Sequence, residues 1–349
     1  MSHNIALNFE DGVTRFIECR PDETIADACY RAGINIPLDC RDGACGTCKC
    51  RVEAGRYQGG NYIEEALSEA EAAEGLALAC QMRPQTDLVL AIAASSEVCK
   101  TKAQTFEAPL RLVERLSETS IAFSLEAPAG LAFLPGQYVN IRVPGTDQQR
   151  SYSFSSAPGA EALSFLVRDI PRGVMSTWLR EVAAPRTPLE LAGPAGSFYL
   201  REVRRPLLFL AGGTGLAPFL SMLAKLAATG SAQSIHLVYG VTNDADLVEV
   251  ARLEEFTARI PGFTFATCVA AERSAHPCKG YVTAHIEPDH LNGGGVDVYL
   301  CGPPPMVDAV RTWLRERGMT PANFYYEKFS PSGASSARRD PPAGGVRVQ

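Results

Sequence analysis

The spacing of four cysteines limits the possible folds of this chain more than any other feature, because it indicates a metal-binding loop. They are Cys40, Cys45, Cys48 and Cys80, arranged as C-x4-C-x2-C with a distant fourth member. This spacing is typical of a [2Fe–2S] cluster held by four thiolates. A zinc site would more often pair two short C-x2–4-C motifs, and a disulfide would suit an oxidising compartment. The spacing therefore predicts a [2Fe–2S] cluster, with Gly43 and Gly46 letting the backbone wrap around it.

Length and composition are those of an ordinary globular protein with two or three domains. The chain has 349 residues, of which 46% are hydrophobic and 21% charged. No apolar run approaches the roughly 18 residues of a membrane-spanning helix, and the start of the chain does not resemble a secretory signal. We therefore expect a cytoplasmic protein with reduced cysteines, and neither a membrane nor nucleic acid as a partner.

Negative charge is concentrated in the N-terminal part of the chain. Residues 1–100 hold 16 Asp and Glu against 9 Lys and Arg, a net charge of −7, whereas the remainder is close to neutral. Such a surface can steer a protein partner, and it can equally serve solubility. The sequence leaves both interpretations open.

The region around the four cysteines has the pattern of short strands and helices. The predicted elements are a hairpin at 5–9 and 13–17, a helix from Thr24 to Gly33, a strand at 50–52, a helix from Ser68 to Gly75 and a strand at 88–91. This order resembles the β-grasp fold of plant-type ferredoxins. The other cysteines of the region are expected to be small buried hydrophobic residues: Cys19, Cys29, Cys50 and Cys99.

From about residue 106 the pattern becomes one of short strands separated by Gly and Pro turns. The predicted strands are 111–116, 121–125, 138–143, 150–154, 163–167 and 188–191. Strands at such spacing predict a small antiparallel β-barrel.

One string within the predicted barrel consists of Arg150, Ser151, Tyr152 and Ser153, followed by Ser156. It resembles the flavin-binding motif of the ferredoxin–NADP reductase superfamily. The resemblance implies that Arg150 clamps the flavin diphosphate, Tyr152 lies against the isoalloxazine ring and Ser153 bonds its N5. A helix N-terminus further on would offer free N–H groups to the same diphosphate. That stretch is Gly173, Val174, Met175, Ser176 and Thr177.

After residue 205, apolar runs alternate with helical patterns, which predicts a doubly wound α/β domain. The expected strands are 207–211, 235–239, 263–268, 296–300 and 324–327, and the expected helices include 218–228 and 306–317. The first turn places glycines between a strand and a helix, where a diphosphate can rest on the helix N-terminus. Pro218 stands where the dehydrogenase fingerprint has its third glycine, so a standard dehydrogenase is not matched.

Two motifs of this domain nevertheless resemble the pyridine-nucleotide loops of the reductase superfamily. Their residues are Gly213, Thr214, Gly215 and Pro218 in the first, and Cys301 and Gly302 in the second. The resemblance implies that Cys301 lies beside the nicotinamide and that Glu327 and Phe329 reach the flavin edge. With Ser153, the residues Cys301 and Glu327 are the candidates for catalysis. Asp246 follows the second strand without a nearby base, which favours NADH over NADPH, although a solvated acidic turn would look the same.

The order of ferredoxin, flavin barrel and nucleotide domain resembles the reductase components of bacterial aromatic oxygenases, in particular the benzoate 1,2-dioxygenase reductase type. The resemblance is carried by the strings 9–16, 35–37, 39–48, 61–64 and 95–101. It implies that electrons pass from NADH through FAD and the cluster to a terminal oxygenase of the Rieske type.

Two alternatives stay open from the sequence. One is a reductase of a soluble di-iron monooxygenase, which would share all three cofactor motifs, and the other is an electron carrier or redox sensor. The expected domain boundaries are 1–100 for the ferredoxin, 101–204 for the flavin barrel and 205–330 for the nucleotide domain. Residues 331–349, rich in Pro, Gly and Ser, are expected to form a disordered tail.

Overall fold

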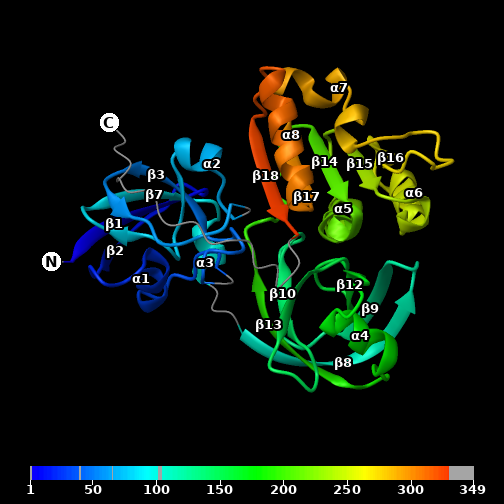
Figure 1. The fold of residues 1–349 in the computed structure, drawn as a ribbon, viewed down its shortest axis with the longest axis horizontal. Helices are drawn as coiled ribbons and strands as arrows, with labels where there is room; N and C mark the ends of the chain where they lie inside the picture. Colours follow the sequence, from blue (N-terminus) through cyan, green and yellow to red (C-terminus); the bar gives the residue numbers. More distant parts are fainter. Residues whose placement is uncertain (1, 39–40, 65, 101–103, 330–349) are drawn as a thin grey trace. The chain divides into compact units, whose positions relative to one another are not determined.

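The computed structural model describes residues 2–38, 41–64, 66–100 and 104–329. Cys40, residues 101–103 and the expected tail therefore lie outside the described residues. The chain divides into two units, the first built from residues up to 103 with 195–197, and the second from 104–194 and 198–329. The predicted ferredoxin is the first unit, and the predicted barrel and nucleotide domain form the second (Figure 1).

A mixed sheet with the order β2-β1-β7-β3-β5 organises the first unit. Its strands are β1 (His3–Phe9), β2 (Thr14–Cys19), β3 (Lys49–Ala54), β5 (Leu76–Leu78) and β7 (Leu88–Ile92). β1 pairs antiparallel with β2 and parallel with β7. Ile5, Leu7 and Phe9 are buried because alternate side chains of a strand share one face. The predicted hairpin and the strand at 88–91 are confirmed.

Capping residues begin the helices of this unit as the sequence predicts. Helix α1 (Ile25–Arg31) follows Thr24, whose hydroxyl accepts the N–H of Asp27. Helix α2 (Glu69–Ala73) follows a complete capping box formed by Ser68 and Glu71. Each cap satisfies backbone donors that a helix start otherwise leaves open.

Two parts of the first unit differ from the sequence-based expectation. Residues 96–100, for which no helix was predicted, form helix α3 (Ser96–Lys100), whose first residue is held by the Asp11 carboxylate, which accepts both the N–H and the hydroxyl of Ser96 at 2.8 Å. A short ladder of β4 (Tyr57–Gln58) and β6 (Arg83–Pro84) was also not predicted. Both features depend on contacts between residues far apart in the sequence.

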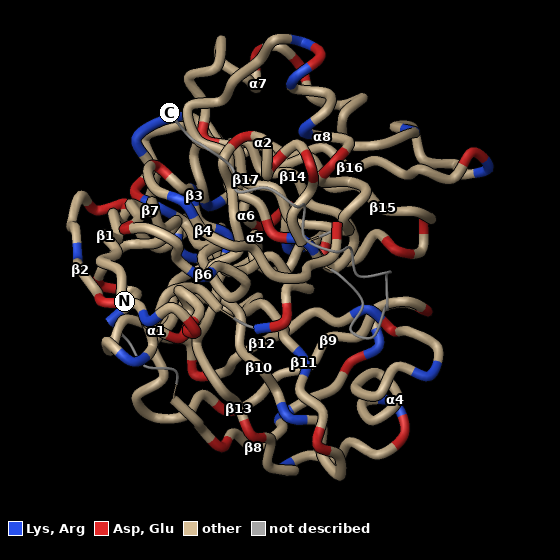
Figure 2. Tube along the Cα trace, turned by 60° about the vertical axis from the view of Figure 1, so that its left-hand side comes forward, with Lys and Arg blue, Asp and Glu red and all other residues tan. Residues whose placement is uncertain are grey.

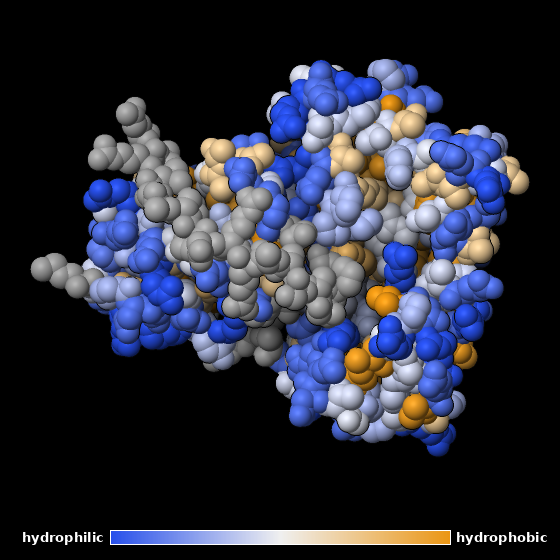
Figure 3. All heavy atoms as spheres, viewed as in Figure 1, coloured by the Kyte–Doolittle hydropathy of each residue, from blue (hydrophilic) through white to orange (hydrophobic). Residues whose placement is uncertain are grey.

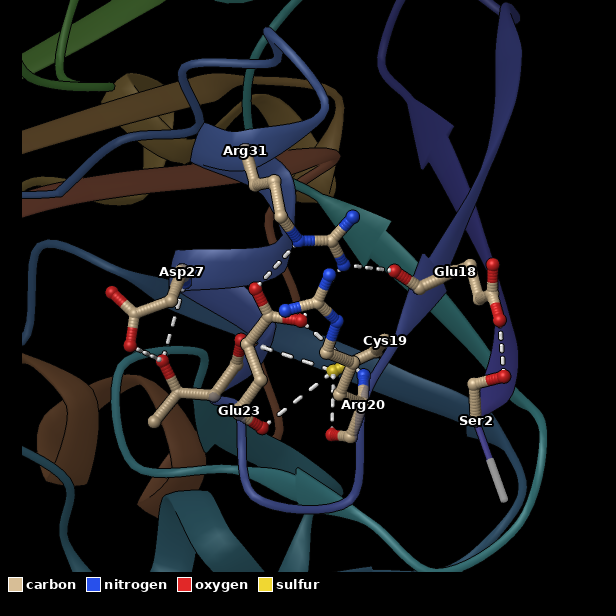
Figure 4. A network of polar contacts seen from close by, with 8 residues as sticks. Ser2, Glu18, Cys19, Arg20, Glu23, Asp27 and Arg31 are labelled. Carbon is tan, nitrogen blue, oxygen red and sulfur yellow. Dashed lines mark hydrogen bonds and ion pairs between the residues drawn. The ribbon is translucent and has the colours of Figure 1, made fainter.

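The four cysteines predicted to be buried are all in the core of the first unit. Cys19, Cys29, Cys50 and Cys99 are at most 2% exposed. Beside Cys19, the Arg31 guanidinium pairs with Glu23 at 2.8 Å and donates to the backbone carbonyl of Glu18 (Figure 4). This pair ties the end of α1 to the end of β2.

The barrel of the second unit has the strand order β11-β10-β13-β8-β9-β12. Its strands are β8 (Gln104–Arg115), β9 (Ser120–Glu126), β10 (Tyr138–Arg142), β11 (Gln149–Ser153), β12 (Ala162–Arg168) and β13 (Pro188–Ala195). A bridge between Phe154 and Phe165 joins the two edges, so the sheet is nearly closed. The predicted strands are confirmed, but β8 starts earlier than expected because its first half pairs with β13.

Aromatic rings fill the barrel. Phe165 is stacked with Phe123 at 4.9 Å between ring centroids, and Phe154 with Phe133 at 3.9 Å. Leu112 and Val182 are exposed apolar residues of this unit. Figure 3 shows scattered hydrophobic side chains at the surface. Single exposed apolar residues of this kind are normal for a globular protein.

The nucleotide domain is a parallel sheet with the order β16-β15-β14-β17-β18. Its strands are β14 (Leu207–Gly212), β15 (Ile235–Val241), β16 (Phe263–Val269), β17 (Asp297–Gly302) and β18 (Asn323–Lys328), and its longer helices are α5 (Ala217–Thr229), α6 (Val250–Arg259) and α8 (Pro304–Glu316). Every residue of β14 and β17 is buried, as expected for central strands with helices on both faces. The predicted doubly wound domain is confirmed.

Within the described part of the chain, no helix combines the length and the apolar character that crossing a membrane requires.

Candidate functional site: a cluster loop, a flavin strand and two nucleotide loops

The predicted cluster loop has the backbone that its glycines suggest. Gly43 and Gly46 have φ of +82° and +74°. A Cβ on Gly43 would lie 2.5 Å from the Asn61 carbonyl oxygen, and one on Gly46 would lie 2.8 Å from the Ala66 carbonyl oxygen. Both the dihedral angle and the lack of space therefore require glycine at these positions.

The pairing of β3 with β5 brings Cys80 close to the loop that carries Cys45 and Cys48. β3 and β5 are antiparallel, and Ala79 N–H donates to the Cys48 carbonyl at 3.0 Å. The thiols of Cys48 and Cys80 are within hydrogen-bonding contact, and this contact and burial raise the pKa of Cys48. Cys45 is half-buried in the same loop, and Cys40 lies outside the described residues. Among the described residues no three metal-binding side chains stand together, so the structure brings together two of the four predicted ligands.

The predicted flavin-binding residues lie on β11, whose alternation divides them between two faces. Arg150 and Tyr152 share one face, while Ser151 and Ser153 share the other. Arg150 donates to the backbone carbonyl of Gln149 and to the Gln148 side chain, which leaves its guanidinium at the surface. Such a position fits an arginine that a diphosphate can reach.

Tyr152 has an environment suited to a flat ligand. Its ring meets Phe123 edge-on at 6.1 Å, and burial raises the pKa of its hydroxyl, so the phenol stays protonated. Ser151 donates to the Asn140 side chain at 2.6 Å on the neighbouring strand. The ring is thus held from one side by the barrel.

Helix α4 (Val174–Glu181) provides the predicted helix N-terminus. Gly173 is its N-cap and brings no side-chain acceptor, so the N–H groups of the first turn keep their capacity to bind an anion. Met175 is buried in the barrel core, and the Ser176 hydroxyl is bonded to the carbonyls of Ile170 and Gly173. Thr177 accepts a bond from Arg180. Any contact of Met175 or Ser176 with a diphosphate would therefore come from the backbone.

The two predicted nucleotide loops pack against each other through glycines. A Cβ on Gly215 would lie 2.4 Å from the Cys301 carbonyl oxygen, and one on Gly302 would lie 3.3 Å from Gly212 Cα. Gly213, by contrast, has φ of +55° and open space where a Cβ would stand. Thr214 lies between Gly213 and Gly215 in the short 3-10 helix that leads into α5, and Pro218 lies in the first turn of α5. This open, glycine-lined turn at a helix start fits a diphosphate.

Three candidate catalytic residues converge where the barrel meets the α/β sheet. Ser153 Oγ donates to Glu327 Oε2 at 3.4 Å, and Glu327 is paired in register with Cys301 across β17 and β18. Cys301 is fully buried, and burial together with the nearby Glu327 carboxylate raises the pKa of its thiol. Phe329 N–H donates to the Gly302 carbonyl at 2.9 Å, which holds the end of the described chain against the second nucleotide loop.

Both carboxylate oxygens of Asp246 already accept hydrogen bonds from neighbouring residues, which its position in the sequence does not reveal. One oxygen accepts both the backbone N–H and the side-chain amide of Asn243 at 3.0 and 3.1 Å. The other accepts the Thr119 hydroxyl from the turn between β8 and β9. A ribose diol would therefore have to compete with these donors for the carboxylate.

One cross-domain residue was missed by sequence reasoning. Arg252 on α6 donates to the backbone carbonyl of Ser155, just after the flavin strand, at 2.8 Å. The sequence alone would place an arginine of an amphipathic helix on its solvent-facing side. No sequence pattern therefore indicates that Arg252 bonds to the barrel.

Models of three domain families match the chain in succession. They are the 2Fe-2S iron-sulfur cluster binding domain over residues 8–85, the oxidoreductase FAD-binding domain over residues 107–199 and the oxidoreductase NAD-binding domain over residues 209–312. The cofactors of this oxidoreductase are thus a [2Fe–2S] cluster, FAD and NAD.

Relatives match over almost the whole length. The toluate 1,2-dioxygenase electron transfer component of Pseudomonas putida is 58% identical, covering 95% of this chain and 100% of the relative. The 2-halobenzoate 1,2-dioxygenase electron transfer component of Burkholderia cepacia is 51% identical, with 95% and 99% coverage. A crystal structure of a cytochrome P450 reductase from Amycolatopsis is 32% identical, with a TM-score of 0.70 and coverage of 94% and 99%. The chain therefore belongs to the family of aromatic 1,2-dioxygenase electron transfer components, flavin- and iron–sulfur-containing oxidoreductases that use NADH.

Proposed function

We propose that this chain passes electrons from NADH through FAD and the [2Fe–2S] cluster to the terminal Rieske-type oxygenase of a benzoate-type 1,2-dioxygenase. A nicotinamide gives two electrons together as hydride, whereas the cluster accepts one at a time. FAD, when bound, supplies the conversion between the two. The role of the polypeptide is to place the three sites and to exclude side reactions.

The observation that carries this proposal is the meeting of Ser153, Glu327 and Cys301. They come from the barrel, the last strand and the second nucleotide loop, yet they lie at one place within the second unit. We assign Ser153 to hold the flavin at the atom that receives hydride, with Glu327 orienting that hydroxyl. Cys301, which stays a neutral thiol because it is buried, would line the nicotinamide side without adding charge.

The remaining site residues receive binding roles. Arg150 and the N–H groups from Gly173 to Thr177 would hold the flavin diphosphate, and the turn from Gly213 to Pro218 would hold that of NADH. Asp246 would accept the ribose hydroxyls of NADH and repel a 2′-phosphate, which supports a preference for NADH over NADPH. Cys40, Cys45, Cys48 and Cys80 would ligate the cluster.

Two further assignments belong to the same proposal. We place the boundary between the flavin and nucleotide domains near residue 204, in the segment between β13 and β14. We also infer a cytoplasmic location, because a cluster held by thiolates and several other free thiols suits a reducing compartment.

The experiment that tests the proposal is anaerobic reduction of a purified benzoate-type oxygenase. The chain is mixed with NADH, or separately with NADPH, and reduction of the oxygenase's Rieske centre is followed. We expect fast reduction that is selective for NADH and lost in Cys48→Ser. If flavin and cluster are bleached while the Rieske centre stays oxidised, the internal electron path stands but the partner is wrong. A soluble di-iron monooxygenase would then be the next acceptor to test.

A further inference from the structure

Lys49 and Glu71 form an ion pair that is largely removed from solvent. Lys49 Nζ lies 2.7 Å from Glu71 Oε1, and the two side chains are 14% and 0% exposed. The other carboxylate oxygen accepts the backbone N–H of Ser68 at 2.8 Å. Each oxygen of Glu71 therefore has a donor, which is the condition under which a buried carboxylate stays charged.

The lysine side chain runs along the cluster loop. Lys49 directly follows Cys48, and its backbone N–H donates to the carbonyl of Gly46 at 3.2 Å. A Cβ on Gly46 would lie 3.4 Å from Lys49 Cε, and the ammonium group is one bond further on. A positive charge thus stands beside residues 45–48, the part of the loop that carries two predicted ligands.

Glu71 belongs to a different element and fixes this charge in place. It lies in the first turn of α2, where the capping box holds its carboxylate through Ser68. The pair therefore joins the ligand loop to α2 by a contact that solvent screens weakly. Arg51, two positions along β3, is by contrast exposed. Figure 2 shows where basic and acidic residues lie along the backbone.

We propose that Lys49 and Glu71 are positioning residues with balanced charges, and that the pairing holds the reduction potential of the cluster against the shift that either charge alone would cause. Reduction transfers one electron from the reduced flavin to the cluster, so the cluster gains one negative charge and no bond forms or breaks. A nearby positive charge favours the reduced cluster, and a nearby negative charge opposes it. Because the two opposite charges lie only 2.7 Å apart, each offsets most of the effect of the other on the cluster potential. This inference rests on the proposed function, since it requires the cluster.

The sign of the effect distinguishes this role from a purely structural one. Glu71→Gln removes the negative charge and keeps the shape, so the midpoint potential of the cluster is expected to rise. Lys49→Gln removes the positive charge, so the potential is expected to fall. The double variant Lys49→Gln with Glu71→Gln is expected to return close to the original potential. These values are measured on the full chain by redox titration, following the EPR signal of the reduced cluster.

Arg51→Gln is the matched control, because it removes an exposed positive charge from the same face of the same strand. We expect no change in potential for it, since solvent and salt screen an exposed charge. Lys49→Arg keeps the charge and is expected to keep the original potential. If Lys49→Gln does not fold, Lys49→Arg and Glu71→Gln still carry the test.

The inference is overturned if Glu71→Gln leaves the potential unchanged or lowers it while the cluster spectrum is intact. It is also overturned if both single variants shift the potential in the same direction, which would indicate loosened packing. Failure of the proposed function looks different, because the unaltered chain would then leave the Rieske centre of the oxygenase oxidised, whatever potentials the variants have.

Discussion

Ser153 Oγ lies 3.4 Å from Glu327 Oε2, although the two residues are 174 positions apart in the sequence. One belongs to the flavin strand of the barrel and the other to the last strand of the nucleotide domain. Ser153 is also buried, and a hydrogen bond is stronger in a buried environment than in water. The contact defines the place where hydride transfer is proposed.

Removal of the Ser153 hydroxyl is expected to slow the reduction of the flavin by NADH. A lost hydrogen bond of this kind is worth about 1 to 2 kcal/mol, which corresponds to roughly tenfold in rate. Stopped-flow measurement of flavin bleaching in Ser153→Ala tests this. Ser124→Ala, in strand β9 of the same barrel, is the control and should react at the original rate. An unaltered rate in Ser153→Ala would remove this residue from the proposed mechanism.

Gly213, which begins the 3-10 helix leading into α5, and Gly230, which caps the C-terminus of α5, provide a matched pair of substitutions. Both have positive φ, +55° and +75°, and both have open space where a Cβ would stand. Alanine at either position is expected to cost about 1 to 2 kcal/mol of folding free energy, because a Cβ disfavours the left-handed region. Gly213→Ala should in addition raise KM for NADH, since its Cβ would occupy the proposed diphosphate site. Equal KM values in the two variants would count against that site.

The Glu23–Arg31 pair is expected to make the first unit sensitive to acid (Figure 4). The hydrogen bond from Arg31 holds the pKa of Glu23 below its ordinary value of 4.5. A lowered pKa in the folded state stabilises the fold above pH 4.5, and this contribution is lost as the pH falls through the folded pKa. Glu23→Gln should therefore be less stable than the original chain at pH 7, and the difference should shrink below pH 4.5.

Amide hydrogen exchange in α1 at both pH values measures this difference. Asp147→Asn is the control, because the Asp147 side chain is fully exposed although it pairs with Arg142. An exposed pair contributes little, so this variant should match the original chain at either pH. If Glu23→Gln is less stable than the original chain by the same amount at low pH as at pH 7, the electrostatic explanation is refuted.

The buried cysteines of the first unit are expected to resist alkylation in the folded protein. Burial raises the pKa of Cys19 to about 11 and those of Cys50 and Cys99 to about 12, so at pH 8 almost no thiolate is present. Cys278 is only half-buried and should be modified first. Mass spectrometry after brief treatment with iodoacetamide distinguishes these positions. Rapid labelling of Cys50 would show that the unit opens more readily than its packing suggests.

Local signals made most of the fold predictable. The Thr24 cap and the Ser68–Glu71 capping box each specify a helix start within four residues, and the structure has both helices there. The largely apolar runs of β14 and β17, both buried along their whole length, likewise mark central parallel strands. These features depend on neighbours in the sequence, so a single sequence is enough to find them.

The parts that could not be predicted depend on distant partners. Asp11 stabilises α3 from 85 positions away, and Thr119 reaches Asp246 across 127 positions. Nothing near Lys49 in the sequence shows that its charge is paired with Glu71 beside the cluster loop. Such contacts arise only when the strands have paired, which no local pattern encodes.

The most direct test of the account is the order in which the cofactors are reduced in a single anaerobic turnover with NADH. The account predicts that flavin absorbance falls first and cluster absorbance follows. In Cys48→Ser the flavin phase should keep its rate while the cluster phase disappears. Bleaching of the cluster before the flavin, or loss of the flavin phase in Cys48→Ser, would contradict the proposed electron path.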